Sequence, residues 1–113
     1  MKKPNWDKIH NMAVQILSQR IHKGDSCFLT VYQLANIMND QDHTLKGDLP
    51  VGGKGEGSKT SDSLVWHVSQ CLAKHKNTFE QRWFCIDRLD SFTIDNIQPS
   101  DNNFSMFRLI DNK

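Results

Sequence analysis

The chain has 113 residues, of which 24% are charged and 37% hydrophobic, and its formal net charge is +1. This composition is typical of one compact domain and excludes a chain that is disordered throughout. No apolar run approaches the ~20 residues of a membrane-spanning helix, and no apolar segment follows the N-terminal lysines as in a secretory signal. Three scattered cysteines, Cys27, Cys71 and Cys85, indicate reduced thiols rather than a disulfide framework. We therefore expect a single cytoplasmic domain spanning residues 1–113.

The first predicted helix begins after Asn5. Asparagine suits the N-cap because its side chain accepts a hydrogen bond from the free amides of the first turn. Gly24 is expected to end this segment, since glycine adopts the left-handed conformation without penalty. Between them, apolar residues recur at helical spacing and should pack into the core: Trp6, Ile9, Met12, Ala13, Ile16, Leu17 and Ile21.

A short apolar run and a second helix follow. Residues 27–29 are too few for an independent strand but can add an edge to a small sheet. Thr30 and Gln33 have the spacing of a capping box, which predicts that a helix begins there. Its apolar face consists of Leu34, Ala35, Ile37 and Met38, and it should end near Asn39 and Asp40.

Residues 41–60 form a long segment that is rich in glycine and lysine and has no helical or strand periodicity. Loops of this length inside a compact domain are usually functional or disordered. The stretch GGKGEGSKT does not match the P-loop, because Lys59 follows Ser58 instead of preceding it. It also lacks the glycine spacing of a dinucleotide fingerprint. We expect a flexible loop between the second and third helices.

The segment 61–75 is predicted to be the third helix, and it is amphipathic. Its apolar side consists of Leu64, Val65, Val68, Cys71 and Leu72, and its polar side of Ser63, His67, Gln70 and Lys74. Aromatic and β-branched residues then alternate with polar ones. This pattern predicts a strand over 83–89, extended structure over 92–97 and a returning strand over 104–110, with 98–103 as the hairpin connection.

This order of elements resembles the winged helix-turn-helix domains of bacterial and phage transcription regulators, an α+β fold of three helices and a small antiparallel hairpin, the wing. The resemblance implies a DNA-binding transcriptional regulator whose third helix enters the major groove of duplex DNA. Carried onto this chain, Ser63, His67 and Gln70 become candidates for contact with base edges. Phosphate contacts are implied for Lys54, Lys59, Lys74 and Lys76, with Ser61 at the start of the helix. The resemblance also implies a homodimer, because one short helix recognises only a half-site, and no cofactor.

Other chemistry has weaker support in the sequence. His67, Cys71 and His75 recur every four residues, as zinc ligands can, but on one straight helix they would span about 12 Å. A buried, apolar role for Cys71 fits that spacing better, and we expect no metal site. Asp87, Asp90 and Asp95 lack the companions of a magnesium-dependent nuclease, so no catalytic site is expected.

A second class of function is a protein-interaction module or inhibitor of phage or plasmid type that has the same fold and does not bind DNA. Near-neutral charge favours it, as does the acidic residue Asp101 in the predicted wing, which would repel a phosphate. Trp66 lies between the two sides of the third helix, and a partly exposed tryptophan can anchor a protein partner. Trp6 and Trp83 are expected to cap the core.

Overall fold

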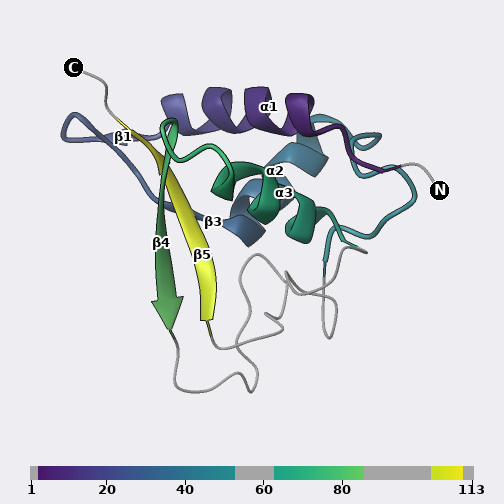
Figure 1. Cartoon of the computed structure of the whole chain (residues 1–113). Coiled ribbons are helices and arrows are strands. Elements are labelled where there is room, and N and C mark those ends of the chain that lie inside the picture. The colour runs from purple at the N-terminus through teal and green to yellow at the C-terminus, as the bar shows by residue number, and fades with distance from the viewer. Residues whose placement is uncertain (1–2, 53–62, 86–102, 111–113) are drawn as a thin grey trace.

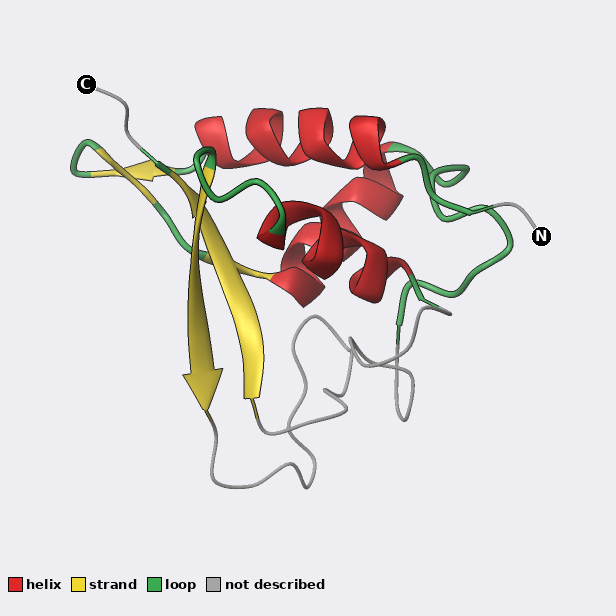
Figure 2. Cartoon of the chain, viewed as in Figure 1, coloured by secondary structure: helices red, strands yellow, loops and turns green. Residues whose placement is uncertain are grey.

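The computed structural model describes residues 3–52, 63–85 and 103–110. The described part is an α+β fold in which three helices lie to one side of a small antiparallel sheet (Figures 1 and 2). The predicted α+β class is therefore confirmed.

Each of the three helices begins at a side-chain cap. Helix α1 is Trp6–Ser18, α2 is Val31–Gln41 and α3 is Leu64–Ala73. Asn5 caps α1 as predicted, its side chain accepting a hydrogen bond from the amide of Lys8. The predicted capping box is also present, since Thr30 and Gln33 each accept a hydrogen bond from the other's backbone amide.

The prediction that the first helix runs to Gly24 was wrong. Helix α1 ends at Ser18, and the chain then forms a hairpin of β1 (Ile21–His22) and β2 (Asp25–Ser26). Lys23 and Gly24 both have positive φ, 52° and 86°, which suits the tight turn between two such strands. Ile21, assigned to the core stripe from its spacing, is consequently 53% exposed.

Within the described residues, three strands form the main sheet in the order β3-β5-β4, and both pairings are antiparallel. The strands are β3 (Leu29–Thr30), β4 (Phe79–Cys85) and β5 (Asn103–Leu109). The short run before Thr30 thus joins the sheet as an edge, as predicted. The strand predicted over 83–89 begins earlier, at Phe79, and its residues 86–89 lie outside the described residues, as does the extended stretch 92–97.

The core lies between the three helices and the helix-facing side of the sheet. Each helix contributes aliphatic side chains, and the sheet contributes three phenylalanines. Among the largest fully buried side chains are Tyr32, Phe104, Phe107, Ile9, Ile16, Leu17, Leu34, Met38, Leu64 and Leu72. Trp6 packs against this core, as predicted. Within the described residues, no helix has the length and apolar character needed to cross a membrane.

The first part of the predicted 41–60 loop is held against the core. The N–H of Asp42 continues the end of α2 by donating to Met38, and Leu45 and Leu49 are buried. Asp42 also forms an ion pair with Lys8 of α1. These contacts hold residues 42–49 against the core. Residues 53–60 of the predicted loop lie outside the described residues.

Candidate nucleic-acid interface

The N-terminus of α3 is buried, which removes the first base-edge candidate from the surface. Ser63 has no exposed area, and its Oγ accepts a hydrogen bond from the amide of Trp66 at 3.2 Å. The backbone amides of Leu64 and Val65 donate to the carbonyls of Pro50 and Val51, so the preceding segment covers this end. Ser63 is therefore a helix cap, and the expectation that it lies on an exposed polar side is corrected.

His67 is also interior, at 5% exposure. The indole Nε1–H of Trp6, the first residue of α1, donates to its Nδ1 at 3.1 Å. The rings of Trp6 and Trp66 both lie edge-on to the imidazole, with centroids 6.2 and 5.0 Å away. His67 is thus part of the packing between α1 and α3, and its expected place on the exposed side is corrected as well.

The accessible side of α3 differs from the predicted one. Trp66, Gln70 and Ala73 are partly exposed, and Lys74 and Lys76 are exposed at the C-terminal end. The ammonium of Lys74 lies 4.5 Å from the ring centroid of Trp6, within the range of a cation–π contact. Of the predicted DNA-contact residues in α3 and directly after it, only Gln70, Lys74 and Lys76 are accessible.

The remaining predicted contact residues lie outside the described residues. They are Lys54, Lys59 and Ser61 of the loop. The same holds for the tip of the predicted wing, including Asp101, and for Asp87, Asp90 and Asp95.

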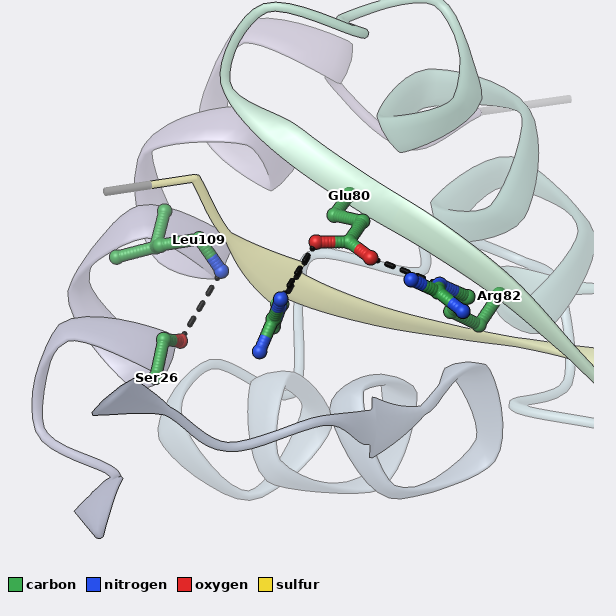
Figure 3. Close-up of polar contacts among 5 residues, drawn as sticks. Ser26, Glu80, Arg82 and Leu109 are labelled. Atoms are coloured by element: carbon green, nitrogen blue, oxygen red, sulfur yellow. Dashed lines mark hydrogen bonds and ion pairs between the residues drawn. The ribbon is translucent and has the colours of Figure 1, made fainter. Parts of the chain in front are cut away.

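A charged network lies across β4 and β5 (Figure 3). One carboxylate oxygen of Glu80 accepts hydrogen bonds from Arg108 at 2.8 and 2.9 Å, and the other accepts one from Arg82 at 2.7 Å. These two arginines hold the pKa of Glu80 below its usual value, with the Arg108 hydrogen bond contributing most. The guanidinium of Arg108 also covers the ring of Phe28 at 4.8 Å. The network carries one more positive than negative charge.

The sequence analysis did not identify this network, because the strand was predicted to begin at Trp83 and not at Phe79. Glu80 and Arg82 are two residues apart, which places their side chains on one face of a strand. Arg108 joins them only because β4 and β5 pair with Glu80 opposite Arg108, a register set by long-range contacts.

Two aromatic side chains are exposed at the end of β4. Trp83 is 67% exposed and Phe84 42%, although the ring of Phe84 packs 5.2 Å from that of Phe104. The prediction that Trp83 caps the core was wrong. Trp83 is the third residue from the end of β4, and this end of the strand extends past α3 (Figure 1).

The described residues contain no group of three or more potential ligands that could hold a metal ion. Cys71 is buried, and its thiol donates to the carbonyl of Trp6 at 3.4 Å. Burial raises the pKa of this thiol to about 11, so it stays protonated at neutral pH. His75 contacts the ring of His10 on α1, with centroids 4.4 Å apart, instead of joining Cys71.

The chain matches no family model, no curated protein and no solved structure. A functional assignment therefore depends on the fold and on the accessible side chains described above. Those side chains fall into two groups, the outward side of α3 and the sheet surface around β4.

Proposed function

We propose that this chain is a winged helix-turn-helix protein that binds duplex DNA and regulates transcription in the cytoplasm. The observation that supports the proposal most is the arrangement of its elements. Apart from the added β1–β2 hairpin, the order α1, β3, α2, α3, β4, β5, with β5 between β3 and β4, resembles that of a winged-helix domain. A function inferred from fold is an analogy, so the proposal also needs support from the chemistry of the accessible side chains.

The DNA-contacting residues in this proposal are fewer than the sequence suggested. Gln70 is the candidate for a base edge, because a carboxamide can pair with adenine through two hydrogen bonds. Lys74 and Lys76 follow at the end of α3, where their ammonium groups suit phosphate oxygens. Ser63 and His67 are left out because both are buried.

The strand pair β4–β5 takes the role of the wing. Arg82, whose side chain is 65% exposed, can approach a phosphate beside the groove that α3 enters. Since Glu80 is already neutralised by two arginines, it repels the DNA backbone less than an unpaired carboxylate would.

The test is a fluorescence-anisotropy titration of the full chain against duplex DNA at several salt concentrations. Affinity should fall as salt rises, because binding releases the counterions condensed on DNA. Gln70→Ala should reduce discrimination between sequences, whereas Lys76→Gln should weaken all duplexes alike and lower the salt slope by about 1.

The matched control is Lys23→Gln, which removes the same charge from the β1–β2 turn. The β1–β2 turn belongs neither to α3 nor to the β4–β5 pair, the elements to which DNA contacts are assigned. Its affinity and salt slope should equal those of the wild type. The proposal fails if no duplex binds at about 50 mM salt, or if binding is independent of salt.

A second candidate function is a protein-interaction module that does not bind DNA. The partly exposed Trp66 and the exposed aromatics of β4 favour it, because aromatic side chains are enriched at the centres of protein interfaces. A single protein captured from cell extract at high salt, and lost with Trp66→Ala, would support this function over DNA binding.

A further inference from the structure

The outer edge of β4 has the features of a strand that pairs with another strand. In the described part of the chain, β4 has one strand neighbour, β5, and lies at the edge of the sheet. Its sequence FEQRWFC contains no proline or glycine, and its register with β5 is continuous over seven residues. Edge strands are usually protected from pairing by a proline, a bulge or charged side chains. β4 has neither proline nor bulge, and its charged residues Glu80 and Arg82 have opposite signs, so they can attract the same residues of an antiparallel copy.

The backbone groups that point outward can be identified from one hydrogen bond. The amide of Ile110 donates to the carbonyl of Thr78 at 2.9 Å, one step beyond the pair Phe79 and Leu109. Because these bonds alternate along an antiparallel pair, the even-numbered residues of β4 bond to β5. The amides and carbonyls of Gln81 and Trp83 and the carbonyl of Phe79 therefore face the outer edge, whereas the amide of Phe79 donates to the carbonyl of His75 at 3.0 Å.

A pocket of about 340 Å³ lies beside this edge. It is formed by the end of α3, including Leu72 and Ala73, and by Phe79 and Gln81 of β4. Trp83 lies on the same face of the strand as Phe79 and Gln81, since all three numbers are odd. β4 thus contains the exposed Trp83 and also, four and two positions before it, the pocket-lining residues Phe79 and Gln81.

We propose that two copies of this chain form a symmetric dimer by pairing their β4 strands antiparallel about Gln81. Gln81 then lies opposite Gln81 of the second copy, and Phe79 lies opposite Trp83 of the second copy. Residues opposite one another project from the same face, so the indole of each copy reaches the pocket beside Phe79 of the other. The pairing therefore covers both exposed tryptophans.

Charge selects this register over its neighbours. About Gln81, Glu80 of each copy lies opposite Arg82 of the other, which gives two attractive cross-strand pairs. Pairing about Glu80 would place the Glu80 carboxylates of the two copies opposite each other. Pairing about Arg82 would place the two Arg82 guanidinium groups opposite each other. Like charges directly opposite are destabilising. Only the register about Gln81 combines opposite charges with placement of Trp83 against Phe79.

The dimer should be weak and depend on concentration. Pairing about Gln81 forms about four new backbone hydrogen bonds, two between the Gln81 residues and one from each Trp83 amide to the Phe79 carbonyl of the other copy. Each buried indole removes about 150–250 Å² from water. An interface of this kind lies at the small end for specific association, so we expect a dissociation constant on the order of micromolar.

Sedimentation velocity of the full chain, without DNA, tests the dimer at concentrations from about 1 to 500 µM. We expect a shift from 13.1 kDa to twice that mass. Trp83→Ala should weaken dimerisation by more than tenfold, and Arg82→Glu should do so as well. The matched control is Phe84→Ala, which removes the neighbouring aromatic from the opposite face and should change the dissociation constant less than threefold.

Circular dichroism shows whether each variant is folded. Dimerisation is compared only among variants that retain the wild-type spectrum. A wild type that stays monomeric throughout overturns the proposal. So does equal loss of dimer in Trp83→Ala and Phe84→Ala, which would indicate non-specific apolar association.

Disulfide formation tests the register directly. Gln81→Cys, in a Cys85→Ser background, should form a covalent dimer with oxidised glutathione, because opposite residues have Cα atoms about 5.5 Å apart. Arg82→Cys in the same background is the control, because residue 82 of the second copy lies diagonally across the strand pair, about 7–8 Å from residue 82 of the first. Equal cross-linking of the two variants would overturn the register. Dimerisation is measured without DNA, so its failure and the failure of DNA binding are distinguishable.

Discussion

The indole of Trp6 donates a hydrogen bond to Nδ1 of His67 at 3.1 Å and so joins the first turn of α1 to the middle of α3. These residues are 61 positions apart in the chain. The contact explains why a histidine on the polar side of an amphipathic helix is buried. It also fixes the orientation of α3, and therefore which of its residues remain accessible.

The Trp6–His67 contact predicts a loss of stability without a change in DNA recognition. Trp6→Phe removes the N–H donor and keeps an aromatic ring, so it should lower the free energy of unfolding by about 0.5–1.5 kcal/mol. Urea denaturation followed by circular dichroism measures this change. His67→Gln should likewise destabilise the protein and leave the sequence preference of any bound duplex unchanged. A changed preference would restore His67 as a base-reading residue.

Ser63 is predicted to act as a helix cap. Ser63→Ala removes the acceptor for the amide of Trp66, which should cost about 0.5–2 kcal/mol of unfolding free energy. Ser63→Thr keeps a hydroxyl at the cap and should recover part of that loss. If Ser63→Ala matches the wild type in thermal and urea denaturation, the capping role is wrong.

The Glu80 network predicts a stability contribution that disappears in acid. Its arginine partners lower the pKa of Glu80 in the folded state, so the contribution is fully present above the ordinary value of 4.5 and is lost as pH falls through the folded pKa. The difference in urea midpoint between the wild type and Glu80→Gln should therefore be largest near pH 7. It should shrink steadily below about pH 4.5; a difference independent of pH would contradict the ion-pair account.

The three cysteines should differ in reactivity toward iodoacetamide. Cys71 is buried and its thiol pKa is raised to about 11, so it should react very slowly in the native protein at pH 8. Cys85 is exposed and should react first, with the partly exposed Cys27 between them. Peptide mass spectrometry after timed quenching identifies the labelled residue. In denaturant all three should react at similar rates, which serves as the control for intrinsic reactivity.

The sequence by itself determined the features that depend on neighbouring residues. Asn5 and the pair Thr30 and Gln33 cap their helices as predicted, because a cap needs only a side-chain acceptor within three residues of a free amide. The returning strand β5 also agrees with its alternating pattern, within one residue at each end.

Local signals were misleading where two structures fit the same residues. The spacing that placed Ile21 on a helical stripe also allowed a two-residue strand. Gly24, with positive φ, can end a helix or form a hairpin turn. In the structure α1 ends at Ser18, and Ile21 and His22 pair with Ser26 and Asp25 instead of continuing the helix.

Only the tertiary structure decided which side of α3 faces solvent and which residues surround Glu80. An amphipathic pattern distinguishes apolar from polar side chains, but it cannot show that Trp6 supplies a partner that makes burial of His67 favourable. The same limit applies to Trp83. Trp83 was predicted to cap the core, but it is exposed near the end of β4. This end of β4 extends past α3 (Figure 1). Long-range packing sets how far each element extends, and the local sequence does not show it.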